Sequence, residues 1–184
     1  MPEDKPRLSL SKQAIFGDET HRGKKIVLGI DPGLASVGYG VVAEENGQLF
    51  HLAHGCVTTQ AGSPSQERLE IIYDALSNLF TLYAPSFGAT ESLYFFRNVS
   101  SALPVAEARG IIKLAFQKFH VPLSEYTPNE IKKAVCGTSR ADKKQVQEMV
   151  RLLVGLSDIP KPDHAADALA AAICGIHRNV LQSM

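Results

Sequence analysis

Short apolar runs separated by turn residues open the regularly patterned part of the chain. Residues 26–30 (Ile-Val-Leu-Gly-Ile) form a nearly continuous apolar run, which is typical of a strand buried on both faces. A second run covers residues 37–43. Asn46-Gly47 is a strong hairpin signal and leads into a third run over residues 48–58. The pattern therefore predicts three antiparallel strands at the start of the fold.

A helical period follows these strands. Between Leu69 and Tyr83, apolar side chains recur every three or four residues, which predicts an amphipathic helix. Ser65 is its expected N-cap, because a serine hydroxyl can accept a hydrogen bond from an otherwise unpaired amide of the first turn. Pro85 is expected to end the helix.

Strands and helices then alternate toward the C-terminus. The pattern predicts strands over residues 87–91 and 121–126, and helices over residues 100–119, 128–135, 142–153 and 163–177. Three hairpin strands followed by this alternation predict an α/β fold. Its five-stranded mixed sheet has three antiparallel strands and then parallel strands, and helices flank both faces.

The helix predicted over residues 100–119 is apolar on more than one side, and its Gly110 leaves room for another helix to approach. A helix with two apolar sides must bury both of them, and the sheet covers only one. We therefore expect a second copy of the chain to cover the other side in a homodimer.

The composition suits a single domain outside membranes. A chain of 184 residues is long enough for one ordinary domain. Residues 1–22 are polar without a sustained period, so we expect a flexible N-terminal extension before a domain over residues 23–184. No apolar run approaches the roughly 18 residues of a membrane helix, and no signal peptide is evident. With three scattered cysteines interpreted as reduced thiols, we expect a cytoplasmic protein with no membrane partner.

The charge is balanced overall but unevenly distributed. The chain has 19 basic and 19 acidic residues, and the segment from Arg97 to Arg151 holds ten of the basic residues and only five of the acidic ones. This local excess is compatible with a DNA footprint and equally with solvated helix faces.

Four polar residues lie next to apolar segments, where an ionisable side chain is unfavourable unless it has a partner. Asp31 ends the first apolar strand, and Glu91 ends the strand over residues 87–91. His164 and Asp167 are three residues apart and share one face of the last helix. Metal-assisted phosphodiester hydrolysis needs such ligands on rigid elements around two Mg²⁺ ions. The four residues are therefore a candidate metal centre.

Each of these residues also has an ordinary structural interpretation. Asp31 precedes Pro-Gly and can serve a turn, Glu91 can open a surface loop, and His164 can be a partly buried polar residue. Asp163 most economically caps the last helix. Six alanines within residues 165–172 favour the metal interpretation, because small side chains let this helix approach the sheet closely.

An aromatic segment directly after the second strand-end carboxylate is a candidate DNA contact. Tyr94, Phe95 and Phe96 cannot all point into one core from a strand end, and Arg97 follows them. An exposed aromatic loop would suit stacking on unpaired bases. The alternative is a loop folded onto its own hydrophobic cluster.

Basic residues form a second candidate contact: Lys132, Lys133, Arg140, Lys143 and Lys144. The loop over residues 137–139 (Gly-Thr-Ser) is rich in backbone donors near a helix start, which suits phosphate groups. A solvated Lys-rich face is the alternative.

Several of these segments, taken in order, resemble the RuvC family of Holliday-junction resolvases. The resemblance runs from about Lys25 to His177. It is carried by residues 29–33 (Gly-Ile-Asp-Pro-Gly), 38–40 (Gly-Tyr-Gly), 91–98 (Glu, aromatics, Arg-Asn), 107–110 (Glu-Ala-Arg-Gly), 141–147 (Ala-Asp-Lys-Lys-Gln-Val-Gln) and 163–170 (Asp-His-Ala-Ala-Asp-Ala-Leu-Ala).

The resemblance implies a ribonuclease-H-like fold and a homodimer that resolves four-way DNA junctions with Mg²⁺ or Mn²⁺. It implies paired symmetric nicks in two strands of like polarity, a sequence preference at the cut, and handover from the branch-migration proteins RuvA and RuvB. In this chain, it implies that Asp31, Glu91 and Asp167 are the catalytic metal ligands.

The resemblance also implies roles for residues outside the acidic set. Tyr94 or Phe95 matches an aromatic that stacks at the opened junction. Lys132 and Lys143 match basic residues that contact the scissile backbone, and Lys143 would also aid catalysis.

His164 stands where many relatives have Asp. Imidazole suits Mn²⁺ better than Mg²⁺ and can also take part in proton transfer. We therefore hypothesise that His164 is a ligand or proton-handling group and that Mn²⁺ supports faster cleavage. Asp163 is four residues from Asp167 and could approach the metal instead, although the family register favours His164.

Three other functions fit parts of the pattern. A related nuclease could act on other branched or RNA substrates, and a junction-binding module could lack catalysis. Nucleotide binders of the sugar-kinase type also begin with an Asp-x-Gly strand and hairpin, but 184 residues cannot supply their second lobe.

Overall fold

Five strands form one mixed sheet at the centre of the molecule. The computed structural model describes residues 24–92 and 99–182 of the chain. In spatial order the strands are β3 (Gln48–Thr58), β2 (Ser36–Glu45), β1 (Lys25–Asp31), β4 (Phe87–Glu91) and β5 (Leu123–Tyr126). The first three strands pair antiparallel, whereas β4 runs parallel to both β1 and β5. The predicted sheet is therefore confirmed.

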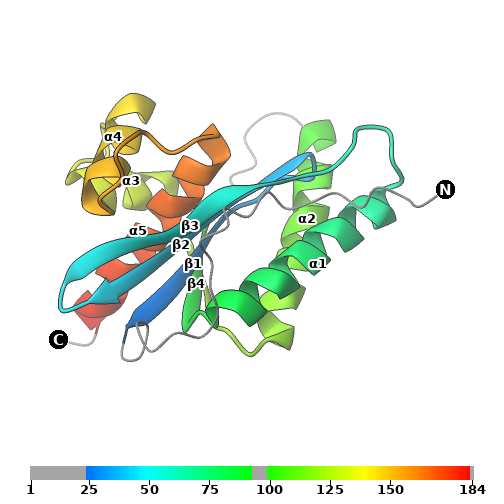
Figure 1. The fold of residues 1–184 in the computed structure, drawn as a ribbon. Coiled ribbons are helices and arrows are strands. Elements are labelled where there is room, and N and C mark those ends of the chain that lie inside the picture. The colour runs from blue at the N-terminus through cyan, green and yellow to red at the C-terminus, as the bar shows by residue number, and fades with distance from the viewer. Residues whose placement is uncertain (1–23, 93–98, 183–184) are drawn as a thin grey trace.

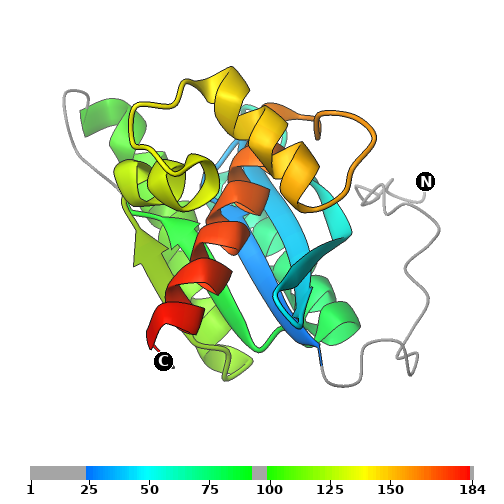
Figure 2. The same cartoon turned by 90° about the vertical axis from the view of Figure 1, so that its left-hand side faces the viewer.

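Helices cover both faces of the sheet (Figure 1). One layer contains α1 (Ser65–Tyr83) and α2 (Val99–Lys118). The other contains α3 (Pro128–Cys136), α4 (Lys143–Leu153) and α5 (Asp163–Gln182), and α5 crosses the sheet directly (Figure 2). Each layer encloses its own apolar cluster. Among the helices that the structure describes, none combines the length and apolar character that a bilayer span requires.

Local sequence signals explain where α3 and α4 begin. Thr127 and Glu130 form a capping box at the start of α3, with the Thr127 hydroxyl accepting from the Glu130 amide at 3.2 Å. Asp142 and Gln145 form the same device at the start of α4. The two capping boxes thus fix the residues at which α3 and α4 begin.

The expectation that Ser65 caps α1 is wrong. Ser65 is already the first helical residue, Pro64 stands at the capping position, and no side chain caps this end. The Ser65 hydroxyl instead donates to Glu107 Oε2 of α2 at 2.8 Å. A contact between helices thus uses the hydroxyl that sequence reasoning assigned to the helix start.

Glycines in the sheet let α5 lie directly on β1 and β2. A Cβ added to Gly29 would lie 1.9 Å from the Ala168 carbonyl oxygen, and one added to Gly38 would lie 2.0 Å from the His164 carbonyl oxygen. The alanines of α5 are also buried: Ala165, Ala166, Ala168, Ala170, Ala171 and Ala172. The backbones of helix and sheet are therefore in contact, without side chains between them.

The side of α2 around Gly110 faces open space. A Cβ added there would meet no described atom within 4 Å. Leu103 and Leu114 are on the same helix and are 63% and 45% exposed. Within the described part of this chain, no helix makes the close approach that Gly110 permits.

The contact of α5 with β1 yields a stability prediction. Gly29→Ala should lower the free energy of unfolding by about 1–3 kcal/mol or more, because the added methyl group must displace the backbone of α5. Urea unfolding followed by circular dichroism measures this. An unchanged unfolding midpoint would contradict the proximity of the two backbones.

Candidate metal centre and nuclease site

Two carboxylates leave the sheet at the same edge. β1 and β4 are parallel neighbours, and Ile30 pairs with Thr90. The next residue of each strand is a carboxylate, Asp31 in β1 and Glu91 in β4. Because neighbouring strands lie about 4.8 Å apart, this register places the two acidic residues side by side. Both are partly buried.

The first turns of α5 bring two more candidate ligands to Asp31. His164 and Asp167 are three residues apart on this helix, and their ligand atoms lie within 4.8 Å of one another and of an Asp31 oxygen. A hydrogen bond joins His164 Nδ1 to Asp31 Oδ2 at 2.6 Å. The structure therefore brings together Asp31, His164 and Asp167, which come from distant parts of the chain.

The electrostatics of the site disfavour three ionised carboxylates without a cation. Burial raises the pKa of Asp31, and the nearby Asp167 raises it further. Burial also raises the pKa of Glu91, and repulsion from Asp31 and Asp167 adds to the effect. The pKa of Asp167 is raised mainly by burial. A bound divalent cation would supply the compensating charge.

Two clefts meet at Glu91. One, of about 280 Å³, is lined by Asp31, Pro32, Glu91, Ser92, Val105, Arg109 and Pro128. The other, of about 210 Å³, is lined by Glu91, Pro128, Ile131, Lys132, Lys143, Val146, Asp167 and Ala170. The acidic residues thus face solvent-accessible space between the two helical layers.

Asp163 does not join the converging ligand atoms. Its carboxylate accepts from Gln147 Nε2 at 3.1 Å and forms an ion pair with Lys143 Nζ at 2.8 Å. The same ammonium lies 3.6 Å from Asp167 Oδ2. The expectation that Asp163 caps α5 is wrong, because it is the first residue of that helix and its carboxylate binds α4 instead.

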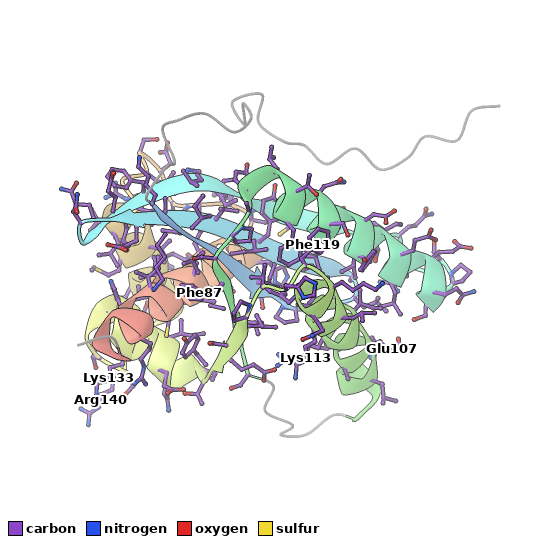
Figure 3. All side chains as sticks on the ribbon, turned by 90° about the horizontal axis from the view of Figure 1, so that it is seen from below. Phe87, Glu107, Lys113, Phe119, Lys133 and Arg140 are labelled. Atoms are coloured by element: carbon purple, nitrogen blue, oxygen red, sulfur yellow. The ribbon has the colours of Figure 1, made fainter. Side chains whose placement is uncertain are left out.

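The predicted DNA contacts divide into two groups. Tyr94, Phe95, Phe96 and Arg97 lie outside the described residues. Lys132 and Lys143 line the cleft that contains Glu91 and Asp167. Lys133 of α3 and Arg140 in the following loop are exposed, and Figure 3 labels both. Lys144 is exposed as well.

Two buried polar residues near the site were not singled out from the sequence. Arg109 of α2 contacts the backbone of Glu91, and Gln147 of α4 holds Asp163. For Arg109 a signal was available, because it stands at helical spacing from Ile112 and Phe116, which are both buried. A charged residue at such a position requires a specific partner.

The sheet order and the acidic site at the strand ends define the ribonuclease-H-like class of nucleases. A family model described as "Crossover junction endodeoxyribonuclease RuvC" matches residues 27–175. The chain therefore belongs to the RuvC family of crossover junction endodeoxyribonucleases and is a nuclease.

Individual relatives agree with this assignment. The crossover junction endodeoxyribonuclease RuvC of Treponema pallidum (strain Nichols) is 49% identical over 152 residues, which are 83% of this chain and 78% of that protein. The protein of the same name from Rubrobacter xylanophilus is 47% identical over 160 residues, which are 87% of this chain and 88% of the relative.

Solved structures of resolvases share the fold. T. thermophilus RuvC in complex with Holliday junction substrate superposes with a TM-score of 0.83 at 32% identity, covering 86% of this chain and 97% of that one. The yeast mitochondrial Holliday junction resolvase Ydc2 has a TM-score of 0.60 at 13% identity, covering 85% and 81%. At this low identity, the second likeness concerns the fold alone.

The crowding of carboxylates predicts a gain in stability when one of them is neutralised. In the absence of divalent ions at neutral pH, Glu91→Gln should raise the melting temperature by about 2–4 °C, the shift that corresponds to about 1 kcal/mol in a domain of this size. The reason is that the amide removes a partly buried charge and its repulsion by Asp31 and Asp167.

Thermal unfolding in EDTA measures this effect. Glu70→Gln is the matched control, since Glu70 is exposed on α1, and its melting temperature should stay within about 1–2 °C of the parent, as for most surface substitutions. A lower melting temperature for Glu91→Gln would contradict the electrostatic interpretation.

Proposed function

We propose that the chain resolves four-way DNA junctions by hydrolysing phosphodiester bonds at the site around Asp31. The observation that carries the proposal is the convergence of Asp31, His164 and Asp167 within 4.8 Å at the edge of the sheet. The relative with a TM-score of 0.83, solved with Holliday junction substrate, supports DNA junctions as the substrate.

The donor set fits divalent ions. Carboxylate oxygens suit Mg²⁺ and Mn²⁺, and an imidazole nitrogen favours Mn²⁺. Burial is the main cause of the raised pKa values of Asp31, Glu91 and Asp167, and a bound cation would favour their ionised forms. We assign Asp31, Glu91, His164 and Asp167 as the residues that hold two ions. Two such metal ions would activate water and stabilise the leaving oxygen in phosphodiester hydrolysis.

Three side chains at the site have proposed roles in this hydrolysis. Asp31 lies between Glu91 of β4 and the two ligands of α5, so it is the residue best placed to serve both ions. The ammonium group of Lys143 lines the cleft of Glu91 and Asp167 and would balance charge that develops on the scissile phosphate. Lys132 lines the same cleft and would hold the DNA backbone.

Two copies of this site would be needed for paired symmetric nicks in strands of like polarity. We infer a homodimer, supported by the exposed Leu103 and Leu114 and the open space beside Gly110 on α2. We propose the branch-migration proteins RuvA and RuvB as partners that hand over the junction to this nuclease. A nuclease specific for other branched or RNA substrates is the alternative, and competition between substrates distinguishes the two.

A cleavage assay tests the function directly. The full-length chain with Mn²⁺ should place two symmetric nicks in a synthetic four-way junction, and Asp31→Asn should slow nicking by at least about 100-fold, because losing a ligand costs several kcal/mol of transition-state stabilisation. Junction affinity should stay within about threefold, because one carboxylate fewer reduces repulsion with DNA.

Asp74→Asn provides the matched control. Asp74 is exposed on α1, in the other helical layer, so this change should leave the nicking rate unaltered. Asp31→Asn protein that nicks at the normal rate would exclude the assigned site. Normal cleavage of linear duplex together with intact junctions would exclude the assigned substrate.

His164 predicts a metal preference. Nicking should be faster with Mn²⁺ than with Mg²⁺. His164→Asp should shift the ratio of the two rates toward Mg²⁺ by about tenfold, since changes around a metal alter its activity, as well as its affinity, by about 10–100-fold. Single-turnover rates at saturating concentrations of each metal provide the measurement. Equal rates with both metals, together with an unchanged rate for His164→Ala, would exclude the role of His164.

A further inference from the structure

A buried arginine closes one side of the cleft that contains Asp31 and Glu91. Arg109 lines this cleft and is only 8% exposed. It comes from α2, which lies on the face of the sheet opposite α5 (Figure 1). Burying a guanidinium group is costly unless its N–H groups and its charge are both satisfied. The partners of Arg109 therefore indicate the role of this buried side chain.

The guanidinium fork of Arg109 joins the ends of two strands. Its Nη1 donates to the backbone oxygen of Glu91 at 2.5 Å, and its Nη2 pairs with Glu125 Oε2 at 2.8 Å. Glu91 is the last residue of β4, and Glu125 lies in β5, paired in register with Thr90. The arginine thus ties the catalytic end of β4 to its neighbouring strand.

The Glu91 carboxylate itself stays available. Within residues 24–92 and 99–182, the structure shows no hydrogen bond to the carboxylate of Glu91. An ion pair between Arg109 and this carboxylate would compete with a metal ion. Glu125 instead takes the charge of Arg109, and the backbone oxygen takes one remaining N–H group.

We propose that Arg109 and Glu125 form a positioning pair that fixes the end of β4 through its backbone, so that the Glu91 carboxylate is held in place for a divalent ion without being neutralised. This inference rests on the proposed role of Glu91 as a metal ligand. Arg109 and Glu125 are positioning residues, since both act through Glu91.

A second basic residue, Lys113, also contacts Glu125. Lys113, one turn further along α2, lies 2.6 Å from Glu125 Oε1 and is 57% exposed. Figure 3 labels Lys113 on α2. It shares the Glu125 carboxylate with Arg109, and none of the hydrogen bonds or ion pairs among the described residues links it to Glu91. Lys113 therefore offers a control within the same charge cluster.

Direct binding of Mn²⁺ to the full-length chain without DNA tests the proposal. The electron paramagnetic resonance signal of free Mn²⁺ reports the dissociation constant. Arg109→Lys keeps the charge but loses the fork, and it should bind Mn²⁺ about 10–100-fold more weakly, the range found when a group that orients a ligand is changed. Its affinity for a four-way junction in EDTA should stay within about twofold, because the charge that DNA senses is unchanged.

Glu125→Gln is the second variant. The amide preserves the shape of the side chain but leaves the Arg109 charge uncompensated and free to turn to the Glu91 carboxylate. Mn²⁺ should then bind about tenfold more weakly. Lys113→Gln, which removes the exposed cation from the same carboxylate, should bind Mn²⁺ within about twofold of the parent, since exposed ion pairs contribute little.

The outcomes separate this inference from the proposed function. If Arg109→Lys and Glu125→Gln both bind Mn²⁺ like the parent, whatever their melting temperatures, the pair is merely structural and the proposal is overturned. If Arg109→Lys does not fold, as judged by circular dichroism, Glu125→Gln alone decides. Unaltered binding by Glu91→Gln overturns the metal-site assignment and this inference together, whereas weakening in Glu91→Gln alone overturns only the inference.

Discussion

The site depends on direct contact between the backbone of α5 and the sheet. At Gly29 and Gly38, carbonyl oxygens of the helix occupy the space that a side chain would fill. This contact leaves almost no freedom in the distance between helix and sheet, because backbone atoms cannot change rotamer as side chains do. His164 and Asp167 are consequently held at a constant distance from Asp31. A layer of larger side chains would have placed the same ligands several ångströms further away.

The same close approach crowds several carboxylates together at the edge of the sheet. Burial raises the pKa of the carboxyl groups of Asp31, Glu91 and Asp167, and repulsion from Asp167 adds to the effect at Asp31 and Glu91. Without a cation, the ionised site is therefore electrostatically unfavourable. Its geometry must therefore be maintained by the rest of the fold. The two apolar clusters provide this support, since strands β1 and β4 are buried along most of their length. The stable sheet thus supports an unfavourable group of charges at its edge, where we propose a pre-organised metal centre.

Sequence patterns predicted the sheet and its strand-end acids well, because period, turn residues and motif order are local properties. They failed where one residue has two possible partners. Ser65 and Asp163 have the chemistry of caps, but tertiary contacts with Glu107 and Lys143 engage their side chains instead. Arg109 was noted only as part of a motif and was given no role, since its partner in β5 is visible only after folding.

Lys143 and Arg109, two of the basic groups at the site, have similar partners. Lys143 has Asp163 at 2.8 Å and is farther, at 3.6 Å, from Asp167. Arg109 has Glu125 and touches Glu91 only through its backbone. Each cation is thus balanced mainly by an acid outside the proposed ligand set. Positive charge can then stand beside the cleft, where it would meet DNA phosphates, while the ligand carboxylates remain to be neutralised by metal ions.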